Sequence, residues 1–441
     1  MNTTPARPRL HFTAARHWIN DPNGLVWHDG EWHLFYQHNP FGDTWGHMSW
    51  GHAVSTDLLH WTELPLAIPE TPEWMAFSGS VVIDGAAMVA CYTGHAQAGG
   101  RQVQLLAHSP DRGRTFTPHA GNPVLDIGEA DFRDPKVFRH DWRWVMLVSM
   151  AQAGALRFYA SADLVQWRFL SEFHVPAFAG CLPWECPDLL QIGGHWLLKW
   201  DVFEGHPAGH SGALAVPGHF DGTRFTPDGP PQWLDGGPDF YAAIAFGAMP
   251  PGYGRRVWIG WMNDHHYAKH TPTSPWRGAM TLPREVTLVP ADHGWAVAQQ
   301  PVRELLALRG APLQAQAASG VLAAPGVLPP AHDLELAIAG PRWQLHLCDG
   351  PAGSAVLAFD GTALRFDRSA AGFPGRYRIA CTPDAAAALR IVVDTGSVEV
   401  FAGDGRTVIT AQVFPPPGHT GVRLVSDAAA RLLRFSAWPL R

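Results

Sequence analysis

Four carboxylates and one serine stand at the head of short apolar runs, at nearly even intervals along the chain. They are Asp21, Ser78, Asp134, Glu185 and Asp239, and successive members are 57, 56, 51 and 54 residues apart. Clustered carboxylates repel one another, so bringing them together costs free energy and points to function rather than packing. One chemistry that needs such groups is hydrolysis of a glycosidic bond. One carboxylate attacks or stabilises the sugar carbon while a second carboxyl group protonates the leaving oxygen.

Asp21 and Glu185 are the natural pair for these two roles, which require different protonation states near neutral pH. The amides around Asp21 are potential donors that would hold it ionised and nucleophilic. Glu185 follows Trp184 and precedes a Cys-Pro pair, an apolar setting that predicts a raised pKa. Asp134 follows Arg133, whose charge favours an ionised acceptor for sugar hydroxyls.

The repeat itself predicts how these side chains are positioned. Each polar residue heads one apolar run, and a second apolar run follows after a glycine or polar turn. A period of about fifty residues with several strands per unit is typical of a β-propeller, whose innermost strands line a central axis. Five units fill the chain from near Arg9 to near Val289. The four carboxylates are therefore expected to converge at this axis.

The remaining third of the chain has a different pattern. Residues 300–309 have helical spacing, and from His332 the apolar residues alternate strictly, as in Leu334-Glu-Leu-Ala-Ile. Period-two runs predict half-buried antiparallel strands. The expected fold is all-β: a five-bladed β-propeller followed by a β-sandwich. We place the propeller at 1–297, a linker at 298–312 and the sandwich at 313–441.

Composition and charge limit which classes of partner and which cell compartment are expected. A net charge of −7 favours neither nucleic acid nor an anionic membrane, and no run is long enough to cross a bilayer. Five scattered cysteines describe no disulfide framework or zinc pattern, and the histidine pairs 206/210 and 265/266 lack further ligands at defined spacing. No metal or other cofactor is expected. Because the N-terminus has no apolar leader, a cytoplasmic protein is expected unless a leader was removed.

Ordered motifs carry a family resemblance over nearly the whole chain. The sequence resembles glycoside hydrolase family 32, which contains invertases, inulinases and levanases. The matching segments are 18–24, 35–40, 77–80, 132–135, 184–188, 239–242, 260–263, 273–285 and 397–401. One departure is His17-Trp18-Ile19, where the family commonly has Met before the Asn.

The resemblance implies a retaining double displacement on β-fructofuranosides without metal. It makes Asp21 the nucleophile, Glu185 the acid/base and Asp134 the transition-state stabiliser. The substrate contacts that it implies are Asn20, Gln37, Trp45, Phe77, Ser78, Arg133, Asp239 and Trp276. Purely structural roles stay open for several of these, above all for Asp239 as a blade-turn residue and Trp276 as a core residue.

The expected substrates are sucrose and short fructo-oligosaccharides, with inulin or levan as further candidates. The segments around Asn39 and Pro272 resemble exo-acting fructan hydrolases, and no basic cluster suggests a phosphorylated substrate. Three alternatives remain open. They are a fructosyltransferase with the same catalytic residues, an inverting arabinan-type propeller hydrolase, and a sugar-binding propeller without catalysis.

Overall fold

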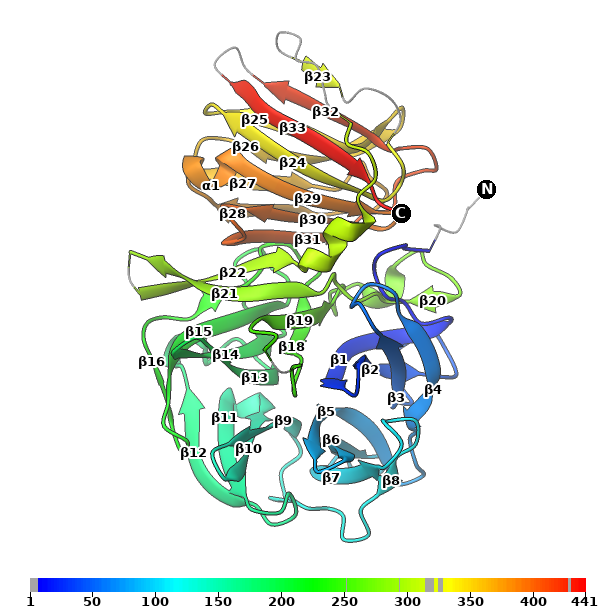
Figure 1. Ribbon diagram of the computed structural model, residues 1–441, viewed down its shortest axis with the longest axis vertical. Helices are drawn as coiled ribbons and strands as arrows, with labels where there is room; N and C mark the ends of the chain where they lie inside the picture. Colours follow the sequence, from blue (N-terminus) through cyan, green and yellow to red (C-terminus); the bar gives the residue numbers. More distant parts are fainter. Residues whose placement is uncertain (1–6, 251, 293, 314–320, 324–327, 427–429) are drawn as a thin grey trace.

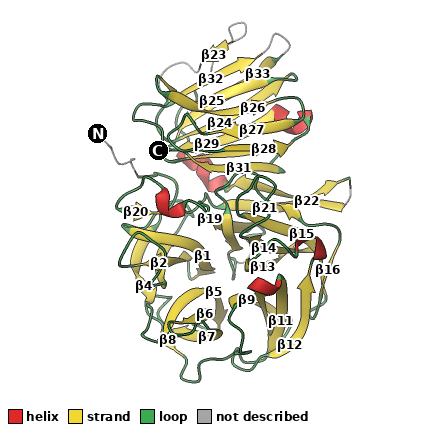
Figure 2. Cartoon of the chain, turned by 180° about the vertical axis from the view of Figure 1, so that it is seen from behind, coloured by secondary structure: helices red, strands yellow, loops and turns green. Residues whose placement is uncertain are grey.

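The computed structural model describes the chain except residues 1–6, 251, 293, 314–320, 324–327 and 427–429, and except the side chains of 321–323. Within these described residues, five sheets precede residue 302 and two sheets follow it (Figure 1). Helical segments are short and scattered between strands, as the view from behind shows (Figure 2). The expected all-β fold is confirmed.

The first two sheets come from the N-terminal part of the chain. Successive strands along the chain are neighbours in each sheet, so each sheet is a meander. The first sheet contains β1 (His17–His28), β2 (Glu31–Asn39), β3 (Ser49–Ser55) and β4 (Thr62–Ile68). The second contains β5 (Trp74–Asp84), β6 (Ala87–Ala96), β7 (Gln102–Ser109) and β8 (Thr117–Pro118).

The third and fourth sheets repeat the same meander. The third contains β9 (Phe132–His140), β10 (Arg143–Met150), β11 (Ala155–Ser161) and β12 (Arg168–His174), with the 3-10 helices η1 (Ala151–Ala153) and η2 (Pro176–Phe178) in its connections. The fourth contains β13 (Trp184–Ile192), β14 (His195–Val202), β15 (Gly212–Phe220), β16 (Phe225–Pro227) and β17 (Gln232–Trp233).

The fifth sheet contacts the first sheet and so completes a ring of five sheets. Its strands are β18 (Tyr241–Ala245), β19 (Arg256–Trp261), β21 (Arg284–Ala291) and β22 (Gly294–Pro301), and η3 (Ala268–His270) and β20 (Trp276–Arg277) lie in the long connection before β21. β20 pairs in parallel with β1. The innermost strands β1, β5, β9, β13 and β18 each contact the next, and β18 contacts β1. The five units counted in the sequence are thus five blades around one axis, a β-propeller.

After β22, the 3-10 helix η4 (Arg303–Leu308) leads into two sheets that pack face to face. One has the order β23-β32-β25-β26-β27-β28 and the other β31-β30-β29-β24-β33. Their facing apolar side chains, including Leu345, Leu357, Ile391 and Val400, form a single buried core, as expected for a sandwich. Bounds are β23 (Val321–Ala323), β24 (His332–Ala339), β25 (Trp343–Gly350), β26 (Gly353–Phe359), β27 (Ala363–Asp367), β28 (Arg376–Ala380), α1 (Pro383–Ala387), β29 (Ala388–Asp394), β30 (Ser397–Ala402), β31 (Thr407–Gln412), β32 (Gly421–Ser426) and β33 (Arg431–Pro439).

Buried charged residues join the sandwich to the propeller. Arg284 of the fifth blade donates to Glu399 of β30 at 2.6 Å, and both side chains are fully buried. His11 lies between Asp394 and Glu399, at 2.9 and 2.8 Å. Buried pairs of this kind are strongly destabilising to break, so the two parts of the chain hold a fixed relative position. No helix in the described chain is long and apolar enough to cross a membrane.

Candidate active site

The innermost strand of every blade is interrupted at the same point. The register of pairing with the next strand shifts between Ile19 and Pro22 in β1, between Ala76 and Gly79 in β5, and at 133–136, 185–188 and 241–244 in β9, β13 and β18. Such a β-bulge re-aims side chains and is frequent beside active sites. The residues around these five bulges face one another across the axis.

The bulge has the same backbone conformation in the last three blades. Asp134, Cys186 and Ala242 occupy the equivalent position, and their φ angles are +64°, +46° and +52°. Non-glycine residues rarely adopt this left-handed conformation, and it costs free energy that surrounding packing must offset. The strained positions are the ones that turn the inner strands toward the axis.

A compact pocket of about 70 Å³ opens at this end of the axis. It contains all three expected catalytic carboxylates, which come from three different blades. Its lining residues are Asn20, Asp21, Gln37, Trp45, Phe77, Ser78, Arg133, Asp134, Glu185 and His265.

Asp21 is held by hydrogen bonds at both carboxylate oxygens. The Asn20 amide donates to Oδ1 at 2.9 Å, and the Ser78 hydroxyl donates to Oδ2 at 2.7 Å. Asn20 is itself oriented by the indole N–H of Trp18, at 2.7 Å. The thiol of Cys186 lies 3.5 Å from Oδ2. Donors on both oxygens fix the direction of the carboxylate, as a nucleophile requires.

Glu185 is gripped by a cation and a phenol. Arg133 Nη2 lies 3.0 Å from Oε1, and the Tyr241 hydroxyl donates to Oε2 at 2.6 Å. Burial alone would raise the pKa of Glu185, but the charges of Arg133 and His265 and the Tyr241 hydrogen bond outweigh it and lower the pKa. The raised pKa expected from its sequence neighbours is therefore wrong, because residues from two other blades determine the direction of the shift.

The pKa of Asp134 also departs from expectation, but in the opposite direction, because it is raised. Its Oδ2 accepts the Cys186 N–H at 2.9 Å, and its own N–H donates to Thr93 at 2.9 Å. Burial is the largest influence and raises the pKa to about 7 against the opposing charge of Arg133, with help from the Glu185 and Asp21 charges. Arg133 does favour the ionised form of Asp134, as expected, but burial outweighs its charge. Because the three carboxyls interact, the site as a whole retains a proton near neutral pH.

The remaining pocket residues form its wall and rim. Gln37 donates to the carbonyl of Ala76 at 3.0 Å, which joins the first blade to the second. Phe77 stacks on His95 with ring centroids 4.6 Å apart, and Trp45 meets Phe77 edge-on. The Trp45 side chain is half exposed, so it offers an apolar face at the mouth of the pocket.

The described residues that line the pocket do not include Asp239 or Trp276. Asp239 is fully buried and bonds to Arg368 and Gln412 of the sandwich, both at 2.7 Å. Trp276 is buried beside a second small cavity that also contacts His11. The regular spacing predicted that Asp239 joins the cluster of carboxylates. The bulge in β18 begins two residues later, so Tyr241 instead of Asp239 is the residue that the fifth blade contributes there.

Tyr241 and His265 are the site residues that the sequence argument missed. Tyr241 lies in the matched segment 239–242, but the spacing of the acidic residues pointed to Asp239 instead. His265 follows β19, and its ring contacts those of Tyr241 and Trp261, with centroids 4.9 and 4.8 Å apart. Its spacing carried no signal for the pocket, because it comes from a loop outside the repeat.

Fold and site together define a glycoside hydrolase, with paired carboxylates around a pocket in a propeller. Family models for the N-terminal and C-terminal domains of glycosyl hydrolases family 32 match residues 11–301 and 355–439. The chain belongs to glycoside hydrolase family 32, and the resemblance read from its motifs is confirmed.

Individual relatives agree with this assignment. The chain is 36% identical to a levanase of Bacillus subtilis, covering 99% of this chain and 70% of the relative. It is 33% identical to an extracellular exo-inulinase of Aspergillus ficuum, covering 97% and 93%. The crystal structure of exo-inulinase from Aspergillus awamori matches with a TM-score of 0.92 and 31% identity, covering 100% of this chain and 99% of that one. A β-fructofuranosidase from Schwanniomyces occidentalis, complexed with fructosyl-erythritol, matches with a TM-score of 0.88 and 26% identity, covering 100% and 98%.

Proposed function

We propose that this enzyme removes terminal β-D-fructofuranosyl units from sucrose and short fructo-oligosaccharides, with retention of configuration. The observation that carries the proposal is the different bonding of the two carboxylates in one pocket. Asp21 accepts from neutral donors on both oxygens, whereas Glu185 is bonded by Arg133 and Tyr241. In the first step Asp21 attacks the anomeric carbon, the glycosidic C–O bond breaks, and Glu185 protonates the departing oxygen. In the second step Glu185 takes a proton from water, which attacks the ester and releases Asp21.

Substrate binding supplies the protonation state that Glu185 needs. The pKa of Asp134 is raised to about 7 and that of Glu185 is lowered, so a proton held by the cluster favours Asp134. Fructose hydroxyls that donate to Asp134 favour its ionised form. The proton then moves to Glu185, beside the leaving oxygen. This transfer makes Asp134 a substrate ligand and a regulator of the acid at the same time.

The pocket's size and rim support an exo-acting enzyme. The pocket is compact and its lining converges from four blades on one point, which suits the end of a sugar chain rather than a long stretch of polymer. Asn20, Gln37, Phe77, Ser78 and Arg133 would surround the fructosyl unit, and the exposed face of Trp45 would meet the sugar that leaves.

Product analysis tests this function. The purified enzyme is incubated with sucrose, kestose, inulin and levan, and the products are resolved by chromatography over time. Free fructose with short substrates preferred is the expected result. Growing oligosaccharides from sucrose would make it a transferase, and equal or better kcat/KM on long levan would overturn the substrate preference. Intact-mass analysis of Glu185→Ala after a rapid quench should detect a fructosyl ester, which a substitution of Asp21 removes.

For the cell compartment, we propose the cytoplasm. All five cysteines are free, and Cys91, Cys186, Cys348 and Cys381 are buried as thiols. Free thiols are typical of reducing compartments, whereas secreted proteins tend to oxidise theirs. Fractionation of cells that express the native gene, with sucrose hydrolysis as the assay, tests this proposal. Activity concentrated in the medium would contradict it.

A further inference from the structure

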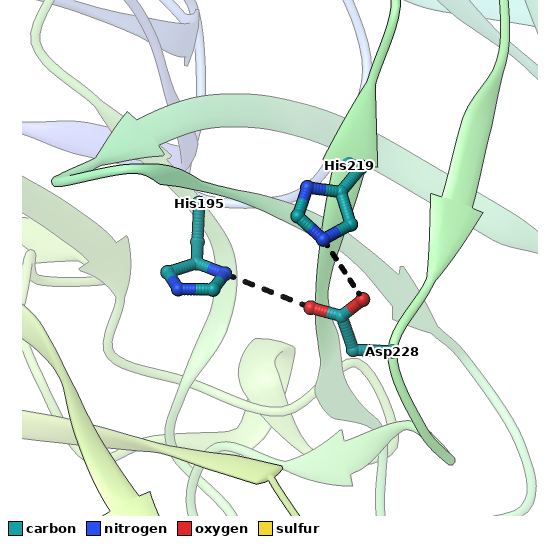
Figure 3. A group of neighbouring side chains, drawn as sticks. All are labelled: His195, His219 and Asp228. Carbon is teal, nitrogen blue, oxygen red and sulfur yellow. Dashed lines mark ion pairs between the residues drawn. The ribbon is translucent and has the colours of Figure 1, made fainter.

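A group of two histidines and one aspartate lies on the outer strands of the fourth blade. His195 is the first residue of β14, His219 lies near the end of β15, and Asp228 follows β16. Their nearest ligand atoms lie within 4.8 Å of one another (Figure 3). His195 is half buried and the other two are exposed, so the group can be reached from solvent.

Strand pairing explains why these residues meet, although they are far apart in the sequence and follow no ligand spacing. The pairing of β14 with β15 ends at Trp196 opposite Gly218, and His195 and His219 are the next residue on each strand. Directly opposed residues on neighbouring strands have their Cβ atoms about 4.5–5.5 Å apart. His219 pairs in turn with Thr226, and Asp228 lies two residues further on the same face. Its N–H donates to the Pro217 carbonyl at 2.9 Å, which keeps it in register.

The distances fit shared coordination better than direct hydrogen bonds. Asp228 lies 3.3 Å from His219 Nε2 and 3.6 Å from His195 Nδ1. His195 Nδ1 is buried and has no hydrogen-bond partner within the described chain. Ligands bound tetrahedrally to zinc at about 2.0–2.1 Å are separated from one another by about 3.3 Å. The two carboxylate–imidazole separations, one to each oxygen of Asp228, are therefore close to the spacing that one ion would impose, and all three ligand groups lie within 4.8 Å of one another.

We propose that His195, His219 and Asp228 bind a divalent transition-metal ion, with zinc as the test ion. Two imidazole nitrogens and one carboxylate oxygen form a donor set that such ions prefer over calcium or magnesium. The ring of Trp295 from β22 packs against His195, with centroids 4.6 Å apart, and limits how that imidazole can turn. Water completes the coordination from the solvent side.

The role of this ion is structural rather than catalytic. Glu185 lies near the start of β13 and His195 follows the two-residue turn at its far end. Seven residues of strand at about 3.3 Å each separate Glu185 from that turn by about 23 Å. The metal would join three successive strands of the blade that carries the acid/base, at the end away from the pocket.

The test uses the full-length enzyme without a histidine tag, titrated calorimetrically with zinc chloride. Wild type is expected to bind one zinc per chain saturably, and His219→Asn and Asp228→Asn should each weaken binding at least about tenfold, since each removes one of three protein ligands. His60→Asn is the matched control, because His60 is exposed and paired with Asp57 at 2.7 Å but has no second histidine in its ion pair. It should bind zinc as wild type does.

Thermal unfolding and activity separate metal binding from damage to the fold. Saturating zinc should raise the Tm of wild type and of His60→Asn, but not of His219→Asn, because a ligand that binds only the folded state stabilises it. All three proteins should hydrolyse sucrose at the same rate without added metal. Equal zinc affinity in wild type and His219→Asn, or the absence of saturable binding in wild type, would overturn the proposal.

Discussion

The carboxylate of Asp239 accepts a 2.7 Å hydrogen bond from Nη1 of Arg368, a residue of the sandwich 129 positions further along the chain. Both side chains are fully buried. The other carboxylate oxygen accepts from the Tyr267 hydroxyl at 2.5 Å. Asp239 is therefore an electrostatic anchor between the two parts of the molecule, and it lies outside the lining of the pocket.

Replacing Asp239 by Asn should lower stability and leave substrate binding nearly unchanged. The substitution leaves Arg368 buried without its counter-charge, and breaking a buried pair costs about 3–5 kcal/mol. Urea unfolding followed by tryptophan fluorescence measures the loss, and KM for sucrose is measured at 25 °C on the folded fraction. Asp134→Asn is the matched control and should lose activity with far less change in stability. A normal unfolding midpoint with a strongly raised KM would return Asp239 to the substrate site.

The fold could be predicted from the sequence, but the location of Asp239 could not. Alternating apolar residues such as Leu334 and Leu336 determine which face of a strand is buried, so blades and sandwich could be predicted. Asp21, Asp134 and Glu185 could be placed because each heads an inner strand. The position of the β-bulge in β18 could not be predicted from the sequence. The bulge brings Tyr241 to the site instead of Asp239, which lies two residues earlier.

The direction of the pKa shift of Glu185 could not be predicted for a related reason. The immediate neighbours of Glu185 are apolar, but Arg133, 52 residues earlier, donates to its carboxylate. A pKa depends on charges within a few ångströms in space, whichever blade supplies them. The same holds for His195 and His219, which meet only because their strands pair.

Glu185→Ala should lose activity in a manner that depends on the leaving group. On sucrose, loss of a general acid is expected to lower kcat/KM by about 10²–10⁴-fold. On fructosyl fluoride, whose leaving group needs no proton, the loss should be much smaller. Steady-state kinetics on both substrates test the role. Equal losses on the two would contradict the acid assignment.

Tyr241→Phe should shift the alkaline limb of the pH profile toward higher pH. The Tyr241 hydroxyl donates to Glu185 at 2.6 Å and lowers the pKa of that carboxyl. Removing the donor raises the pKa, so Glu185 stays protonated to higher pH and the acid form persists. The profile of kcat/KM for sucrose measures the shift.

The control for this phenol is Tyr253→Phe, because the Tyr253 hydroxyl contacts Glu304 and lies outside the pocket lining. Its profile should overlay that of wild type. If Tyr241→Phe changed the rate at every pH by one factor, with no shift of the limb, the phenol would serve binding geometry rather than the protonation of Glu185.

His11 should make stability depend on pH between about 6.5 and 9. Burial would lower the pKa of His11, but its hydrogen bonds and ion pairs to Asp394 and Glu399 outweigh burial and raise the pKa to about 9. A cationic group with a raised pKa contributes stability that is complete below its unfolded value, near 6.5, and is lost as pH rises through the folded value. His11→Asn should therefore be much less stable than wild type at pH 6, by about 3–5 kcal/mol for a broken buried pair. The difference in stability should shrink as pH approaches 9.5.

Urea unfolding of both proteins across this range measures the difference in stability. His60→Asn, altered at an exposed imidazole, is the control and should follow wild type throughout. A gap that stays constant with pH would mean that His11 is not charged between its two carboxylates.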